Sequence, residues 1–274
     1  GSGPPLLQVH GYPQTHVTSH KVAPALADHF TLVIPDLRGY GQSSVPASDP
    51  EHSAYSKRTM TNDLVAVMAA LGHERFYLAG HDRGARVSYR LALDHPDRVE
   101  KLAVLDIVTT LDTWEAMDAK AAMKTYHWMF LAQPEPFPET LIGARPVYYL
   151  DHTIASWTKT QSLDVFDPRA LEQYRAFFSE PDRIHATCED YRAGQTYDLA
   201  ADEADFASGK RIACPLLALW GAAGIPAGGL SPLDIWRNWA DDVRGGSIDS
   251  GHFVCEENPE AAVKELLAFF RGET

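Results

Sequence analysis

The chain has 274 residues, 45% of them hydrophobic, and a formal net charge of −13 at pH 7. This length can bury a large core as one domain with an insertion, and the acidic charge argues against nucleic acid or an anionic membrane as a partner. No apolar run is long enough to cross a bilayer, and no signal-peptide pattern opens the chain. Three scattered cysteines suit a reducing cytoplasm better than a disulfide framework or a zinc site, so we expect a cytoplasmic protein without a metal.

Short apolar runs alternate with amphipathic segments in the first part of the chain. Strands are predicted at 6–10 and 31–36, and helices at 18–28 and 57–71. The sequence Gly39-Tyr40-Gly41 weakly resembles a dinucleotide fingerprint, but the third glycine and the following helix are missing. We therefore expect no nucleotide cofactor.

The most informative stretch is Gly80-His81-Asp82-Arg83-Gly84, where an apolar run ends and a helical pattern begins. It matches the nucleophile elbow Gly-x-Ser-x-Gly, with aspartate in place of serine. Gly80 and Gly84 supply the small residues that a crowded strand-to-helix turn needs, and such a turn would hold Asp82 above the sheet. On this pattern alone, Asp82 could also be an ordinary helix cap.

The alternation of strands and helices stops after a further predicted strand at 101–106. Residues 108–205 carry large aromatic residues and short helical runs separated by prolines, without a strand pattern. We predict that they form a helical cap inserted into an α/β core made of residues 1–107 and 206–274. Because helical crossovers join parallel strands, the core is predicted to be a mostly parallel sheet flanked by helices.

The strand pattern resumes at 215–221, and a helix near 232–240, a strand near 245–249 and a final helix at about 257–271 follow. A parallel sheet binds its ligand at the carboxyl ends of its strands. Three titratable residues are predicted at such ends, in the order nucleophile, acid and base of an α/β hydrolase: Asp82, Asp106 and His252. Taken singly, Asp106 could be a helix cap and His252 an ordinary loop residue.

An aspartate nucleophile is already ionised at neutral pH and attacks saturated carbon to form an alkyl-enzyme ester. His252, oriented by Asp106, would then take a proton from the water that hydrolyses this ester. The oxyanion that develops on the Asp82 carboxyl group would be stabilised by the backbone N–H groups of Tyr12 and Arg83.

Two arginines on the first turn after the nucleophile indicate an anionic substrate. Arg83 and Arg86 can bind a carboxylate in a forked geometry and reverse the acidic field locally. The alternative is that one or both pair with structural acids. In the cap, His127, Trp128 and Tyr191 are compact donors able to hold a departing halide, although each alone is more often a core aromatic.

The chain resembles the fluoroacetate (haloacetate) dehalogenases of the α/β-hydrolase superfamily along nearly its whole length. The matching segments are His10-Gly11-Tyr12-Pro13-Gln14-Thr15, residues 80–90, Leu105-Asp106-Ile107, Tyr126-His127-Trp128, residues 188–194 and Ser250-Gly251-His252-Phe253. Arginine after the nucleophile is specific to this family, because related haloalkane dehalogenases and epoxide hydrolases usually carry tryptophan there.

The resemblance implies that Asp82 is the nucleophile, with His252 as base and Asp106 as its partner. It implies carboxylate binding by Arg83 and Arg86, and halide binding by the three cap donors His127, Trp128 and Tyr191. It also implies an inverted 2-hydroxy acid product, a small haloacid as the sole partner, no cofactor and a homodimer.

The sequence departs from the family pattern in three places. Tyr12 stands where the family usually has phenylalanine, and Ser19 replaces a larger aromatic residue. The first predicted strand corresponds to the third strand of the family fold, so its usual leading pair is not expected here. None of these departures touches the predicted triad.

Two other functions remain open on the sequence. An epoxide hydrolase would share the Asp82 nucleophile and use cap tyrosines such as Tyr126 and Tyr191, but a neutral epoxide does not require Arg83 and Arg86. A non-catalytic small-molecule receptor on the same scaffold is disfavoured by the complete triad. A thiol mechanism through Cys255 is not expected, because this residue is predicted to pack inward.

Overall fold

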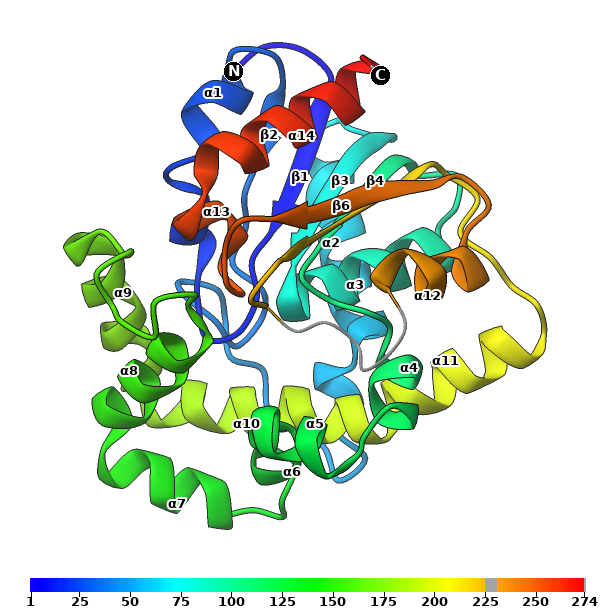
Figure 1. The fold of residues 1–274 in the computed structure, drawn as a ribbon. Helices are drawn as coiled ribbons and strands as arrows, with labels where there is room; N and C mark the ends of the chain where they lie inside the picture. Colours follow the sequence, from blue (N-terminus) through cyan, green and yellow to red (C-terminus); the bar gives the residue numbers. More distant parts are fainter. Residues whose placement is uncertain (225–230, 274) are drawn as a thin grey trace.

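The computed structural model describes residues 1–224 and 231–273 and shows a sheet with helices on both faces and a helical cap at one end (Figure 1). The six strands are all parallel, in the order β2-β1-β3-β4-β5-β6. Their bounds are Pro5–Val9 (β1), Thr31–Val33 (β2), Phe76–His81 (β3), Val99–Leu105 (β4), Leu216–Gly221 (β5) and Val243–Ile248 (β6). The predicted fold class, a parallel sheet flanked by helices with a helical insertion, is confirmed.

Helices fall into a core set and a cap set. The core set is α1 (Ala23–Ala27), α2 (Lys57–Ala70), α3 (Asp82–Asp94), α12 (Pro232–Trp239), α13 (Val254–Glu257) and α14 (Pro259–Arg271), with two 3₁₀ turns at His16–Ser19 and Ser53–Tyr55. The cap set is α4 (Thr110–Glu115), α5 (Ala119–Lys124), α6 (Tyr126–Leu131), α7 (Phe137–Ala144), α8 (Pro146–Trp157), α9 (Pro168–Phe178), α10 (Pro181–Gln195) and α11 (Tyr197–Ala207). The exact division at residues 107/108 and 205/206 stays a prediction.

Most residues of the central strands are apolar and buried because both faces of the sheet are covered. Neighbouring side chains point to opposite faces, so Leu6 packs in one buried cluster and Leu7 in the other. The cluster of Leu6 is closed by α1 and α14. The cluster of Leu7 is closed by α2, α3 and α12 and continues without interruption into cap residues such as Leu131 and Tyr174.

Some elements are shorter than the sequence pattern predicts. The strand expected at 31–36 ends at Val33, and Pro35 has no N–H group with which to extend the ladder. The segment 18–28 forms a 3₁₀ turn followed by a five-residue helix, with Pro24 in the first turn of that helix. The final helix begins at Pro259, two residues later than expected, after the separate short helix α13.

The strand-to-helix turn between β3 and α3 is built by close backbone packing. A Cβ atom on Gly84 would lie 2.1 Å from the carbonyl oxygen of His10, and one on Gly80 would lie 2.7 Å from the Cα atom of Ala85. Asp82 itself has a φ of 48°, in the left-handed region that is strained for residues other than glycine. The turn therefore lifts Asp82 out of the sheet plane, as the elbow motif predicts.

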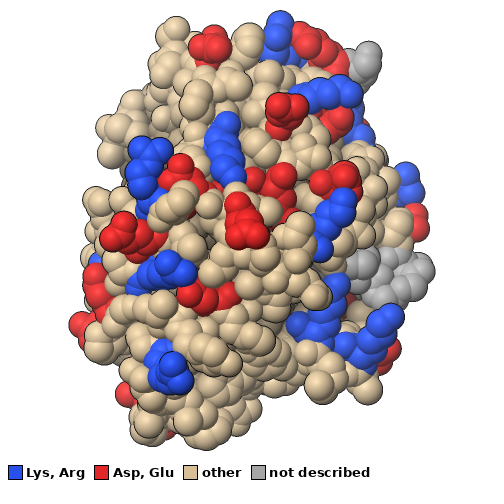
Figure 2. Space-filling view, turned by 60° about the vertical axis from the view of Figure 1, so that its left-hand side comes forward, with Lys and Arg blue, Asp and Glu red and all other residues tan. Residues whose placement is uncertain are grey.

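Figure 2 shows acidic and basic side chains interspersed on one face, with fewer of them toward the end where the cap lies. Exposed apolar side chains in the cap include Phe137, Leu141 and Tyr148. The expected homodimer stays a prediction. Within residues 1–224 and 231–273, no helix combines the length and apolar character needed to cross a membrane.

Substituting Gly84→Ala should destabilise the elbow, because the new Cβ atom meets backbone atoms of β1 that cannot move aside. We expect the free energy of unfolding to fall by about 2–3 kcal/mol, measured by urea denaturation. Gly246→Ala in β6 is the control, since nothing lies within 4 Å of its Cβ position. Equal stability of the two variants would contradict this account of the turn.

Candidate active site

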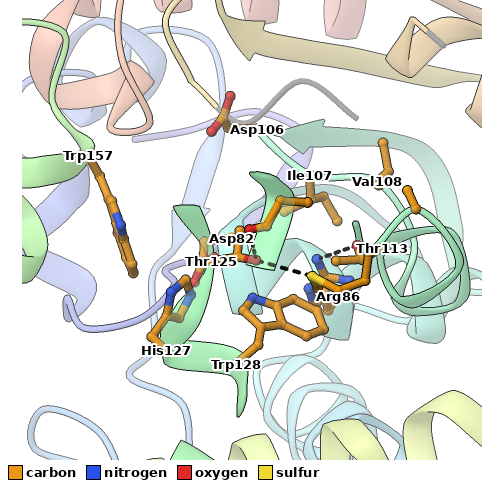
Figure 3. A pocket seen from close by; sticks show the side chains of 13 residues that line it. Asp82, Arg86, Asp106, Ile107, Val108, Thr113, Thr125, His127, Trp128 and Trp157 are labelled. Atoms are coloured by element: carbon orange, nitrogen blue, oxygen red, sulfur yellow. Dashed lines mark hydrogen bonds between the residues drawn. The ribbon is translucent and has the colours of Figure 1, made fainter. Parts of the chain in front are cut away.

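A small cavity lies at the carboxyl ends of the strands, between the sheet and the cap (Figure 3). Asp82 and Arg86 come from the elbow and α3, Asp106 follows β4, and His127, Trp128 and Trp157 come from the cap. Its volume is about 60 Å³, which is space for about four to six water-sized groups. The cavity therefore suits a very small molecule.

Asp82 and Asp106 line this cavity, and the ring of His252 lies within 4 Å of both carboxylates. The Nδ1 atom of His252 lies 2.6 Å from Oδ2 of Asp106, whose Oδ1 accepts a hydrogen bond from the backbone N–H of Gly221 at 2.9 Å. With Nδ1–H donated to Asp106, the other ring nitrogen, Nε2, carries the lone pair. Nε2 lies 3.6 Å from Oδ2 of Asp82 and has no hydrogen-bond partner among the described residues.

The two oxygens of the Asp82 carboxylate have different surroundings. Oδ1 accepts a hydrogen bond from the backbone N–H of Tyr12 at 2.8 Å, and the backbone N–H of Arg83 also donates to the carboxylate. Oδ2 faces His252. This arrangement leaves Oδ2 as the oxygen that can attack, with Oδ1 already held by the backbone N–H of Tyr12.

Charges around the triad set its protonation. Burial acts to raise the pKa of Asp82, but the charges of His252, His81 and Arg83 and the Arg83 amide outweigh it, so this pKa is lowered. Burial acts to lower the pKa of His252, but the hydrogen bond and charge of Asp106, with the charge of Asp82, raise it above its ordinary value. Asp82 is thus ionised at neutral pH.

Arg86 is a buried cation that lines the cavity without a carboxylate partner in the described part of the chain. Its Nη1 and Nη2 donate to the hydroxyl groups of Thr110 at 3.2 Å and Thr113 at 3.3 Å, and its Nε has no partner there. Burial lowers the pKa of Arg86, although an arginine remains charged at neutral pH. Its positive charge is therefore available to an anion in the cavity.

Arg83 is held differently, by an acidic residue of the cap. Its Nη2 donates to Oδ1 of Asp190 at 2.7 Å and to the Asp190 carbonyl at 2.6 Å, and its Nε lies 3.3 Å from both carboxylate oxygens. Only Nη1 is left without a partner among the residues described. Arg83 therefore pairs with an acid of the cap and keeps one nitrogen available, whereas Arg86 pairs with no carboxylate among the described residues.

The three proposed halide donors come together, although Tyr191 lies more than 60 residues after His127 and Trp128 in the chain. The ring centroid of Tyr191 lies 5.7 Å from that of His127 and 6.1 Å from that of Trp128. Among the described residues, neither Nδ1 of His127 nor the hydroxyl group of Tyr191 has a hydrogen-bond partner. Both groups are therefore available to hydrogen-bond a small ligand in the site.

Both of these groups keep the hydrogen that a donor needs. Burial lowers the pKa of His127 to about 3, so its ring is neutral at pH 7 and carries one N–H. Burial, with the charge of Asp82, raises the pKa of Tyr191 well above its usual value, so its O–H stays protonated. The pocket thus offers neutral donors beside a cationic anchor.

Sequence reasoning missed two residues of the site. Asp190, the partner of Arg83, appeared only as a neighbour of Tyr191, and Trp157, which lines the cavity, only as one of many cap aromatics. Tyr126 does not line the cavity and is 38% exposed. In the part of the chain that the structure describes, no group of three or more His, Cys, Asp or Glu side chains could hold a metal ion.

A family model described as "alpha/beta hydrolase fold" matches residues 4–259. A fluoroacetate dehalogenase from Burkholderia sp. is 43% identical to this chain over 269 residues, which cover 98% of the chain and 88% of that protein. A soluble epoxide hydrolase from Corynebacterium sp. (strain C12) is 32% identical over 273 residues, covering 98% of the chain and 91% of that protein.

Solved structures of a candidate α/β hydrolase and of a candidate epoxide hydrolase also resemble this chain. A candidate α/β hydrolase from Nostoc sp. PCC 7120 superposes with a TM-score of 0.95 at 53% identity, covering 98% of this chain and 91% of that one. A candidate epoxide hydrolase from Pseudomonas aeruginosa superposes with a TM-score of 0.93 at 46% identity, covering 99% and 90%. Sequence likeness alone therefore does not separate dehalogenation from epoxide hydrolysis.

The pKa of His252 should fall when either neighbouring carboxylate is neutralised. We expect a larger fall in Asp106→Asn, which also loses the charged hydrogen-bond acceptor, than in Asp82→Asn, which loses only a nearby charge. NMR titration of the histidine ring resonances measures both values. An unchanged pKa in both variants would show that these carboxylates do not set the protonation of His252.

Proposed function

Since the chain belongs to the α/β-hydrolase family, we propose that its site hydrolyses the carbon–halogen bond of haloacetate and similar short 2-haloacids, releasing halide and the 2-hydroxy acid. The observation that carries the proposal is the pairing of an ionised Asp82 with Arg86, a buried cation whose described partners are all neutral hydroxyl groups. A haloacetate ion is also of the size that the cavity admits.

The first step is displacement at saturated carbon. Oδ2 of Asp82 attacks the carbon that bears the halogen, the carbon–oxygen bond forms as the carbon–halogen bond breaks, and the halide leaves with the bonding pair. Attack from the face opposite the halogen inverts that carbon. Because Arg86 neutralises the carboxylate of the substrate, the repulsion between this carboxylate and Asp82 is reduced.

The second step is hydrolysis of the Asp82 ester. His252 accepts a proton from water at Nε2, and the resulting hydroxide attacks Cγ of Asp82. The negative charge develops on Oδ1, which already accepts from the backbone N–H of Tyr12. The intermediate then collapses: the bond between Cγ and Oδ2 breaks, the 2-hydroxy acid leaves with Oδ2, and Nε2 of His252 returns its proton to that oxygen. Because the pKa of His252 is raised, this step should slow as the pH falls through that pKa and the ring becomes protonated.

The departing halide needs hydrogen-bond donors that carry no competing partner. His127 and Tyr191 fit this need, since their polar atoms are buried and unpartnered among the described residues. Trp128 lies beside them and has the guanidinium carbon of Arg86 4.5 Å from its ring centroid. We assign these three residues to halide binding.

Epoxide hydrolysis is the second candidate, favoured by the epoxide hydrolase relatives and by the free hydroxyl group of Tyr191. That reaction shares the Asp82 ester but protonates a ring oxygen, usually with two tyrosines. Tyr126, the other cap tyrosine considered, is 38% exposed and lines a neighbouring pocket with Trp157 and His252. A neutral epoxide makes no use of the positive charge of Arg86, which counts against this reaction.

The decisive experiment measures halide release from fluoro-, chloro- and bromoacetate, with styrene oxide assayed in parallel. We expect release of halide from at least one haloacetate, none in Asp82→Asn, and an alkylated Asp82 in His252→Asn that denaturing mass spectrometry detects. Single turnover in heavy-oxygen water should label the carboxylate of Asp82. Diol formation from styrene oxide without halide release would establish the epoxide hydrolase instead, and neither activity would favour the receptor.

Arg86→Ala should lose the charge that binds the carboxylate of the substrate. We expect kcat/KM for chloroacetate to fall about a hundredfold or more, as for loss of a buried charge-assisted hydrogen bond. The free energy of unfolding should stay near that of the parent, because the substitution removes a buried cation whose partners among the described residues are neutral hydroxyl groups. A folded variant with full activity on haloacids would refute the assignment of Arg86.

A further inference from the structure

Helix α10 contains a glycine whose presence its own helix does not require. Gly194 lies inside α10 and is buried, and it has no positive φ that would call for glycine. Glycine within a helix is destabilising relative to alanine. The cause of its presence is outside the helix: a Cβ atom at this position would lie 2.9 Å from Nη2 and 3.4 Å from Nη1 of Arg83.

The same helix supplies every charged contact of that guanidinium among the described residues. Asp190, one turn before Gly194, accepts from Nε and Nη2 of Arg83 with its carboxylate and again from Nη2 with its carbonyl oxygen. The ring of Tyr191 lies below the guanidinium, with its centroid 4.1 Å from Cζ. Asp190 therefore binds the edge of the guanidinium, Tyr191 covers one of its faces, and Gly194 lies beside its Nη atoms.

The acidic side of this enclosure is itself fixed by core residues. Asp190 also accepts from the ammonium group of Lys57 and, at 2.7 Å, from the hydroxyl group of Tyr40. The charges of Arg83 and Lys57 hold the pKa of Asp190 well below its usual range, although burial acts in the opposite direction. Asp190 thus stays ionised and cannot rotate away from Arg83 without leaving buried donors unpaired.

We propose that Asp190, Tyr191 and Gly194 form a guanidinium cradle on the cap helix α10, which positions Arg83 so that Nη1 binds the carboxylate of a 2-haloacid. Gly194 is the position that sets the depth of the guanidinium in this cradle. The inference rests on the proposed function and adds a determinant of substrate class: acids bind well, and neutral haloacetyl compounds of the same shape gain nothing from the cradle.

The test compares two glycine-to-alanine substitutions in cap helices. Gly194→Ala should displace the guanidinium by a few tenths of an ångström, whereas Gly143→Ala in α7 meets nothing within 4 Å. We expect Gly194→Ala to raise KM for chloroacetate about tenfold and leave the rate with neutral 2-chloroacetamide within about twofold. Gly143→Ala should match the parent on both substrates, and neither variant should melt at a lower temperature.

A second substitution tests the acidic side of the cradle. Asp190→Asn replaces one acceptor by a donor, so the guanidinium should lose its position while the shape of the side chain is kept. We expect a larger rise in KM for chloroacetate than in Gly194→Ala, again without a matching change for 2-chloroacetamide. Thermal unfolding of the variant shows whether it is folded; if it is not, Gly194→Ala alone decides.

The outcomes separate the cradle from the proposed function. Equal losses on the acid and the amide, equal losses in Gly194→Ala and Gly143→Ala, or an unchanged KM in Gly194→Ala would each overturn the cradle. If the parent releases no halide from any haloacetate, the proposed function fails instead. Calorimetric binding of acetate then still tests the cradle, since Gly194→Ala should bind acetate about tenfold more weakly than Gly143→Ala if the inference holds.

Discussion

A carboxylate that stays ionised while buried is the constraint on which the rest of the site depends. Asp82 is 8% exposed, and burial alone would favour its neutral form, which cannot attack carbon. Two backbone amides and nearby positive charge reverse that preference. The amides reach Asp82 only because Gly80 and Gly84 let β1, β3 and α3 approach at van der Waals distance. Close backbone packing at the elbow therefore also helps to keep Asp82 ionised.

The chain has a net charge of −13. Its site can nevertheless attract an anion, because the two arginines there are buried and the acid that pairs with Arg83 lies in the cap. Asp190 balances Arg83 from within the cap, whereas Arg86 is held by the neutral Thr110 and Thr113. Water is largely excluded from this region, so such charges act over short distances with little screening. The general acidity of the surface does not cancel this local field.

The sequence was sufficient for the fold class and for the elbow, because parallel strands buried on both faces and a Gly-x-Asp-x-Gly turn leave direct signals in the order of residues. It was not sufficient for the partner of Arg83, because Asp190 lies 107 positions away and nothing local distinguishes it from a solvated acid. The role of Gly194 could not be predicted for the same reason, because the side chain that it accommodates belongs to another helix. The early end of β2 reflects Pro35, a signal that was present but outweighed by the apolar run before it.

The buried cluster that contains Leu7 runs from the sheet into the cap without a break. An insertion attached in this way is a second half of the same hydrophobic core, and removing it would uncover the apolar surface above α3 and the strand ends. Residues that shape the pocket from the cap, such as Trp128 and Tyr191, are also members of this cluster. A substitution at one of these positions that changes substrate preference therefore also changes the packing of the core. This restricts the substitutions by which the specificity of such a chain can evolve.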